Sequence, residues 1–154
     1  MADTPSKVSR SYPHEWRFVY APDGVSYEVR YFDEQGRPSP ANGTVGRHVF
    51  TFDRLAGLES VKSLDADGTP VQPTTGCSEL RRTYDTAHRL ASIECRGTDG
   101  EFAASNIILE AIRWAPHAAR VVIERDGTGV TNAYFDVNGE LLTRVACGAA
   151  RCFR

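Results

Sequence analysis

One short pattern, a strand end followed by a tight turn, recurs along the chain and limits its fold more than any other feature. Its copies read YFDEQGRP at 31–38, SLDADGTP at 63–70, CRGTDG at 95–100 and YFDVNG at 134–139. In such turns an Asp side chain accepts hydrogen bonds from nearby backbone N–H groups, and Gly takes the positive φ that a short hairpin loop needs. We therefore interpret Asp33, Asp65 and Asp136 as turn formers rather than as catalytic groups.

The copies of this turn are evenly spaced. Gly36, Gly68 and Gly100 follow one another at intervals of 32 residues. Each unit contains a strand, a turn, a second strand, the Asp/Gly turn, and a connection with Pro or Gly. A constant unit length predicts a repeat architecture, and consecutive strands joined by tight turns predict an antiparallel meander.

Alternating side chains predict the strands themselves. In residues 15–20 and 25–33, aromatic and aliphatic side chains occupy every second position, which is the period of a strand with one buried face. Four such units and a last strand at 151–154 predict an all-β meander of about eight to ten strands. Because a long sheet twists and must hide its edges, we expect it to be strongly curved or closed into a barrel by pairing of the first and last strands.

The repeat is interrupted once, at about residues 101–118, where we expect a short helical or irregular insertion. Gly100 and Ile123 are 23 residues apart, whereas the corresponding step from Gly36 to Phe52 is 16 residues. Polar residues at positions 106, 110, 113 and 117 form one stripe of a helix. Alternation through Ile108, Ile112 and Trp114 instead favours a strand, so both interpretations of 105–115 stay open.

Length and composition describe one ordinary soluble domain. The 154 residues are enough to bury a core, and we expect a loose segment at 1–13 followed by a single β-repeat domain at 14–154. A net charge of -2 argues against nucleic-acid binding and against a polybasic membrane patch. Residues 1–11 lack the apolar core of a signal peptide, so we expect a cytoplasmic protein, with signal-independent export as the alternative.

The motif Y-F-D-x-x-G-x-P, followed by a Gly-containing spacer, a small residue with Arg, and a strand ending in [YF]-D, resembles the YD-type repeats of RHS-like proteins. It is also similar to MORN-type β-hairpin repeats, and the resemblance covers residues 15–154. RHS-type sheets wrap toxin cargo and MORN-type arrays mediate protein or lipid contacts. The resemblance therefore implies an interaction protein, for example an immunity- or toxin-associated one, and no catalytic residues.

The four cysteines lie at positions that allow two disulfides. Cys77 and Cys95 would lie opposite each other in a hairpin that turns about Thr86, and Cys147 and Cys152 flank a short loop. Because no export signal is evident, we favour four reduced, half-buried thiols and keep the two bridges as the alternative. The spacing of cysteines and histidines does not fit a metal site, so we expect neither a metal nor a cofactor.

The sequence favours a non-enzymatic protein-interaction or assembly module that binds a protein or forms homo-oligomers through its sheet edges. The alternatives are a small β-barrel that binds an apolar molecule and a barrel cyclase or isomerase without a recognisable motif. An enzyme of that kind would use His48, Glu110, Arg113 and Tyr134. The residues expected to bind a ligand or partner are Phe50, Phe52, Ile108, Ile112, Trp114, Arg81 and Arg82.

Overall fold

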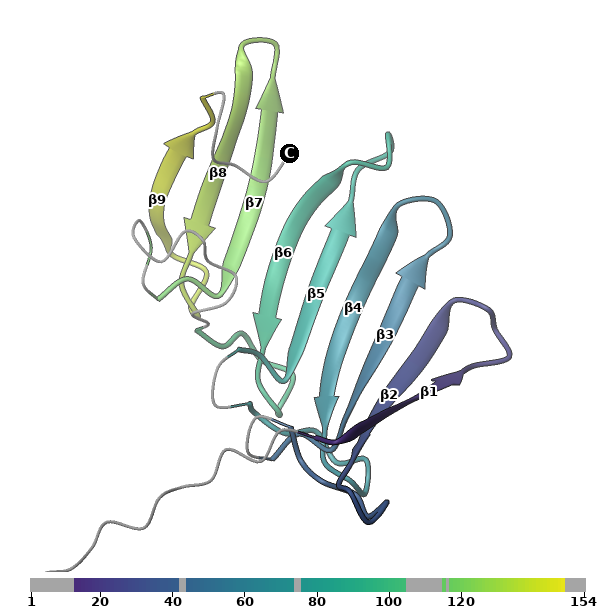
Figure 1. The fold of residues 1–154 in the computed structure, drawn as a ribbon. Coiled ribbons are helices and arrows are strands. Elements are labelled where there is room, and N and C mark those ends of the chain that lie inside the picture. The colour runs from purple at the N-terminus through teal and green to yellow at the C-terminus, as the bar shows by residue number, and fades with distance from the viewer. Residues whose placement is uncertain (1–12, 42–43, 74–75, 105–114, 116, 149–154) are drawn as a thin grey trace, which may run out of the picture.

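The structure is a computed structural model that describes residues 13–41, 44–73, 76–104, 115 and 117–148. These residues form one antiparallel sheet of nine strands, in which neighbours in the chain are neighbours in the sheet (Figure 1). The strands are β1 (Glu15–Tyr20), β2 (Ser26–Phe32), β3 (Arg47–Asp53), β4 (Gly57–Leu64), β5 (Glu79–Tyr84), β6 (Leu90–Arg96), β7 (Arg120–Asp126), β8 (Gly129–Phe135) and β9 (Leu141–Ala146). The all-β meander is confirmed. Across the described ranges no helix is long and apolar enough to cross a membrane.

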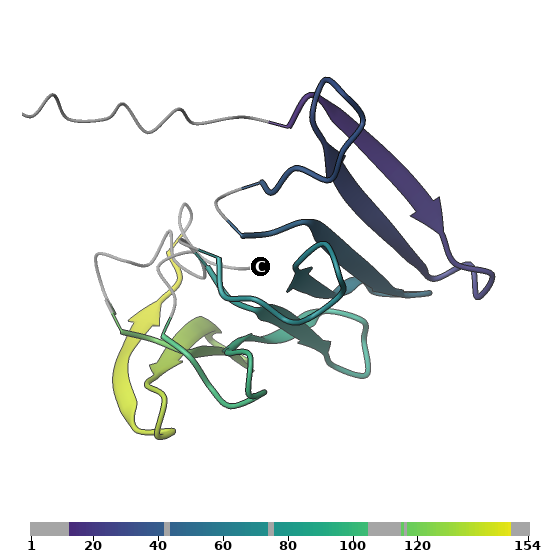
Figure 2. The same ribbon diagram turned by 90° about the horizontal axis from the view of Figure 1, so that it is seen from below.

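The sheet is open, so the prediction of a barrel is wrong. In the described part of the chain, β1 pairs only with β2 and β9 only with β8, and the two edges end a curved arc (Figure 2). The hairpins are joined to one another by short pairings, with only three residue pairs between β4 and β5 and three between β6 and β7. They therefore splay like a fan (Figure 1) and do not roll up to bring β9 beside β1.

Parts of the sequence interpretation fall outside the described residues. These parts include residues 1–12 of the expected loose start at 1–13, most of the insertion at 101–118 and the proposed last strand at 151–154. The ninth strand is instead Leu141–Ala146. At the start of the insertion, Phe102 forms one bridge to Arg96.

The same backbone turn ends β2, β4, β6 and β8. After β2, Asp33 N–H donates to the Arg37 carbonyl at 2.9 Å, and Gly36 N–H donates to the Asp33 carbonyl at 3.0 Å. Gly36 has a φ of 73°, which favours glycine. The same two bonds close residues 65–69, 97–101 and 136–140. The carboxylates of Asp33, Asp65 and Asp136 accept backbone N–H bonds inside their turns, which confirms their role as turn formers.

A fifth copy of this turn lies at the opposite end of the sheet, between β5 and β6. Asp85 N–H donates to the Arg89 carbonyl at 2.9 Å, and His88 N–H donates to the Asp85 carbonyl at 2.9 Å. His88 takes the position of the glycine with a φ of 58°. Histidine is one of the residues that tolerate this left-handed conformation best.

The residues that follow each Asp/Gly turn differ in whether they stay beside the preceding strand, and this difference accounts for β9. Pro38, Pro70 and Phe102 each form a single bridge to the preceding strand, after which the chain leaves and the next long strand takes the place beside it. Leu141 holds the equivalent position opposite Phe135. Here the chain continues beside β8 and forms β9. At positions 38 and 70, proline lacks an N–H group to donate to the preceding strand, which favours the chain leaving that strand.

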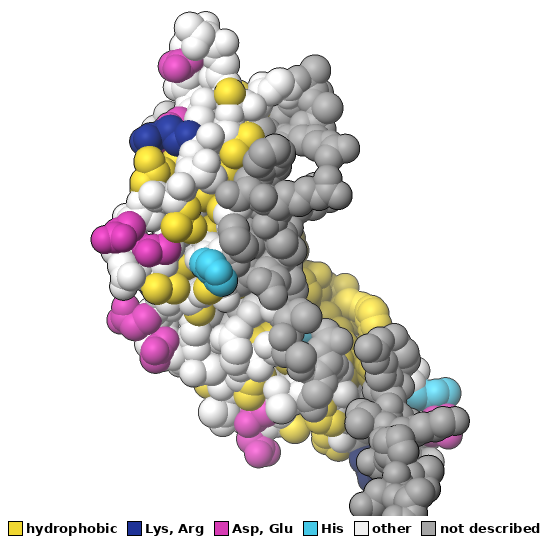
Figure 3. All heavy atoms as spheres, turned by 90° about the vertical axis from the view of Figure 1, so that its left-hand side faces the viewer, with side chains coloured by type: hydrophobic (Ala, Val, Ile, Leu, Met, Phe, Trp, Pro, Cys, Tyr) yellow, Lys and Arg dark blue, Asp and Glu magenta, His cyan; other side chains and the backbone are white. Residues whose placement is uncertain are grey.

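One face of the sheet is apolar, and the connections after the turns cover part of it. The larger buried cluster spans the C-terminal half: Cys77, Ile93, Cys95, Ala115, Ala118, Val121 and Tyr134. The smaller one lies at β2 and contains only Val29, Tyr31 and Val45. On the β9 side of the molecule, hydrophobic side chains lie among Asp and Glu side chains (Figure 3).

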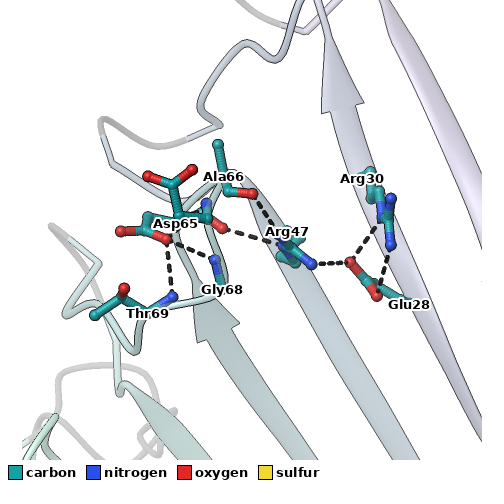
Figure 4. A network of polar contacts seen from close by, with 8 residues as sticks. Glu28, Arg30, Arg47, Asp65, Ala66, Gly68 and Thr69 are labelled. Atoms are coloured by element: carbon teal, nitrogen blue, oxygen red, sulfur yellow. Dashed lines mark hydrogen bonds and ion pairs between the residues drawn. The ribbon is translucent and has the colours of Figure 1, made fainter.

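The opposite face of the sheet carries ion pairs between neighbouring strands. In the pair that joins β2 and β3, Arg47 Nη1 donates to Glu28 Oε1 at 2.9 Å, while Nε and Nη2 donate to the backbone carbonyls of Asp65 and Ala66 (Figure 4). Arg47 therefore ties β2 and β3 to the turn after β4. The adjacent Gly46 has no room for a side chain, because a Cβ atom there would lie 2.5 Å from the Ala66 nitrogen.

Candidate functional site

Aromatic side chains from β1, β2 and β3 gather at one end of the apolar face. The register places Trp16 opposite Tyr31, Tyr20 opposite Tyr27, and Tyr27 opposite Phe50. Opposite residues of an antiparallel pair share a face, so these side chains form one continuous surface. We define the aromatic face as Trp16, Phe18, Tyr20, Tyr27, Phe50 and Phe52.

The rings of the aromatic face support one another across the strands. Tyr27 lies at their centre, with its ring stacked on Phe50 at a centroid distance of 4.9 Å and on Phe52 at 5.7 Å. Its ring also lies 6.1 Å from Phe18 and 5.8 Å from Tyr20. Aromatic pairs of this kind stabilise by roughly 0.5–1.5 kcal/mol beyond their buried area. The surface is thus held in place by its own contacts.

The outer row of the aromatic face is open to solvent. Trp16, Phe18 and Tyr20 are 60%, 53% and 75% exposed, and every residue of β1 is exposed. Contiguous apolar surface of this kind marks interaction sites in soluble proteins.

β1 also presents backbone hydrogen-bonding groups along its outer edge. Ala21 N–H donates to the Ser26 carbonyl at 3.0 Å, and paired positions alternate along an antiparallel ladder. Arg17 and Val19 therefore bond to β2, while the N–H and C=O groups of Trp16, Phe18 and Tyr20 point away from it. No strand of the described residues lies on that side, and β1 lacks the Lys, Pro or bulge that often protects an edge.

A polar pair lies beside the aromatic face. The Tyr31 hydroxyl and His48 Nδ1 are 2.5 Å apart, and the Trp16 ring meets the Tyr31 ring edge-on at 5.9 Å. Burial raises the pKa of Tyr31 and lowers the pKa of His48. Both side chains are therefore neutral near pH 7 and share one hydrogen bond between the Tyr31 hydroxyl and His48 Nδ1. The pair fixes the His48 ring against β2.

The candidate catalytic residues do not come together in the described structure. His48 lies on β3 and Tyr134 on β8, five steps away in the strand order. This is roughly 24 Å at the usual strand spacing. Glu110 and Arg113 lie outside the described residues. Within the described ranges, no group of three His, Cys, Asp or Glu side chains could hold a metal ion.

The candidate binding residues divide between the two faces. Phe50 and Phe52 belong to the aromatic face, where they stack on Tyr27. Arg81 pairs with Glu79 at 3.1 Å, whereas Arg82 lies opposite Ile93, and its buried Nε has no hydrogen-bond partner in the part of the chain that the structure describes. Three further candidates lie outside the described residues: Ile108, Ile112 and Trp114.

Alternation in residues 15–20 predicts a strand with one buried face, yet the aromatic residues of β1 are exposed. Their alternation with polar residues shows that β1 has an apolar face, but it carries no information about whether that face is covered. The available signal was their place on the first strand of a meander, which is an edge strand unless the sheet closes.

Cys77 and Cys95 form a disulfide, with an S–S distance of 2.05 Å, so the interpretation as reduced thiols is wrong for this pair. The hairpin register differs from the predicted one, because Leu80 lies opposite Cys95 and the register shifts between Thr83 and Tyr84. Cys77 reaches Cys95 from the connection before β5. The second predicted bridge involves Cys152, which lies outside the described residues.

A shallow hollow of about 440 Å³ lies at one end of the aromatic face and is open to solvent. It is lined by Tyr20, Tyr27 and Phe52 together with Asp53 and Arg54. The hollow therefore extends the aromatic face towards the loops that join β1 to β2 and β3 to β4.

Comparisons with protein-family models, with curated proteins and with solved structures give no match to this chain. The resemblance to YD-type and MORN-type repeats therefore stays a prediction, and the function is inferred from the geometry of the site.

Proposed function

We propose that this chain is a non-enzymatic interaction module of β-hairpin repeats, whose edge strand β1 and aromatic face bind an extended strand of a partner protein. One observation carries the proposal: the three aromatic side chains of β1 are more than half exposed, on a strand whose outer backbone groups face solvent. In strand addition, backbone hydrogen bonds supply affinity and alternate side chains supply specificity. β1 offers both.

The chemistry of β1 defines the partner strand. The side chains on one face of the partner strand would pack against Trp16, Phe18 and Tyr20, so they are apolar. The side chains on its other face would lie beside Glu15 and Arg17. These two residues form an ion pair, with Arg17 Nε 2.7 Å from Glu15 Oε1, and so neutralise each other. The fitting partner is therefore a strand in which apolar and polar residues alternate, without a need for net charge.

The alternatives have less support. The ligand-binding barrel and the barrel enzyme both need a closed sheet around an internal cavity, and the described sheet is open. An immunity or toxin-associated role is one form of the proposed interaction. A disulfide such as Cys77–Cys95 is typical of oxidising compartments, so the cytoplasmic location stays a prediction that counting free thiols in protein isolated from its own cells would test.

Two short synthetic peptides test the proposed function. One alternates Tyr with Thr, and the other contains the same residues in two blocks. We expect the fluorescently labelled alternating peptide to bind the full chain at least roughly tenfold more tightly. Phe18→Arg should abolish binding, while Leu142→Arg should not, although Leu142 is similarly exposed on the other edge strand. Equal binding of the two peptides, or full binding by Phe18→Arg, contradicts the proposal.

A further inference from the structure

The strand that best fits the description of the partner is β1 itself. Its sequence EWRFVY places aromatic residues at every second position and a Glu–Arg pair between them. We propose that two copies of this chain pair antiparallel through β1, centred on Phe18, so that their sheets join into one. This inference rests on the proposed function, because it names the partner strand.

The outward backbone groups select the register. Only Trp16, Phe18 and Tyr20 point away from β2, so these residues must face one another across a two-fold axis. With Phe18 at the centre, Phe18 faces itself and Trp16 faces Tyr20 of the second copy. The three facing pairs then form about six backbone hydrogen bonds, two for each pair, and the two aromatic faces become continuous.

This register also avoids like charges on the opposite face. Arg17 faces Val19 of the second copy and keeps its ion pair with Glu15. A register centred on Arg17 would place two guanidinium groups opposite each other, which is destabilising. A register centred on Trp16 would leave Tyr20 beyond the end of the pairing.

The other edge strand, β9, is not self-complementary in this way. Cys147 N–H donates to the Val130 carbonyl at 2.7 Å, so by the same alternation the backbone of Arg144 points outward. Two copies of β9 centred there would place Arg144 opposite itself. Antiparallel pairing of β1 with β9 would set Phe18 against Arg144 and join an aromatic face to a charged one, because Arg144 pairs with Glu124 on the charged face at 3.2 Å.

The exposed rings of β1 offer less area than a standard interface buries. At these exposures, Trp16, Phe18 and Tyr20 together offer roughly 300–400 Å² of aromatic surface in each copy. A specific interface usually buries roughly 800 Å² from each partner, and the β1 backbone and Val19 add to the aromatic area. We therefore expect dimers that form reversibly as the protein concentration rises.

Sedimentation equilibrium of the full chain over a range of concentrations tests the dimer. We expect the apparent mass to rise from 17.0 kDa towards twice that value. Phe18→Arg places two positive charges at the two-fold axis and should remain monomeric at every concentration. Leu142→Arg should dimerise like the parent chain, and circular dichroism checks that both variants keep the sheet.

Single cysteines test the register without a disruptive charge. Phe18→Cys should cross-link to its own copy in a glutathione buffer, whereas Trp16→Cys should link only to Tyr20→Cys. Self-linking of Trp16→Cys without self-linking of Phe18→Cys overturns the register. A parent chain that stays monomeric, together with a Phe18→Cys variant that does not cross-link, overturns the dimer. If the alternating peptide still binds in that case, the proposed function stands and only the second copy is rejected.

Discussion

Equivalent positions in the first and the last of the four repeat hairpins differ in how far they are covered. Trp16 lies opposite Tyr31 on the next strand, and Val121 lies in the same way opposite Tyr134. Trp16 is 60% exposed, whereas Val121 is fully buried. Both strands open a repeat hairpin, but β1 is an edge strand, whereas β7 also pairs with β6 and places Val121 opposite Ile93. The difference in exposure therefore comes both from the neighbouring strand and from what lies above the sheet.

The cover comes from the connections that follow the Asp/Gly turns. In the C-terminal half, Cys77, Ala115 and Ala118 belong to such connections and pack against Ile93, Cys95 and Val121. At the N-terminal end, Val45 covers Val29 and Tyr31 but not the outer row on β1. Every strand thus contributes apolar side chains to the same face. Its neighbouring strands and the connections above it decide whether those side chains are buried or exposed.

The largest expected loss of stability comes from removing the Cys77–Cys95 disulfide, which ties the connection before β5 to the apolar face of the sheet. Replacing both Cys77 and Cys95 by Ala should lower the free energy of unfolding by about 3 kcal/mol, because the disulfide closes a loop with a sequence separation of 18. Urea denaturation measures the loss. A reducing agent should destabilise the parent chain by a similar amount and should affect the double variant less. A loss below about 1 kcal/mol would mean that packing alone holds the cover.

A matched pair of truncations tests the comparison directly. Ile123 on β7 lies opposite Asn132 and is 6% exposed, while Phe18 in the equivalent position on β1 is 53% exposed. Ile123→Ala should cost about 3 kcal/mol through lost burial and a new cavity. Phe18→Ala should cost less than about 1 kcal/mol despite the larger side chain removed. Equal losses in urea denaturation would show that the aromatic face is part of the stabilising core.

Asn132 offers a change that should stabilise the covered half. It is 1% exposed and lies between Ile123 and Val145, and neither its Oδ1 nor its Nδ2 has a hydrogen-bond partner among the described residues. Asn132→Val removes an unsatisfied amide and should raise the free energy of unfolding by about 1–2 kcal/mol.

The matched control for this position is Asn132→Asp, which places a charge in the same site and should be destabilising. If Asn132→Val instead lowers the denaturation midpoint, the amide makes a favourable interaction, for example with a bound water.

The turns and strand order were predictable because local residues determine them. Asp33 and Gly36 set a hairpin turn within five residues, and alternation identifies strands without reference to the rest of the chain. Sheet closure depends instead on pairing between hairpins, where β4–β5 has only three paired positions. No local pattern encodes this. The exposure of Trp16 also depends on whether the sheet closes, so the local sequence does not show whether this side chain is exposed or buried.

The smallest expected effect lies beside the open aromatic face. Burial lowers the pKa of His48 below its ordinary value of 6.5. The unfolded chain then takes up this proton more readily than the folded one, so stability should fall as the pH drops below 6.5 and level off below the folded-state pKa. His48→Gln cannot titrate but keeps an acceptor for the Tyr31 hydroxyl, so this part of the pH dependence should vanish. Urea denaturation of both chains at about pH 7.5 and about pH 5.5 measures the difference. If both chains lose the same free energy of unfolding between these pH values, a group other than His48 takes up the proton.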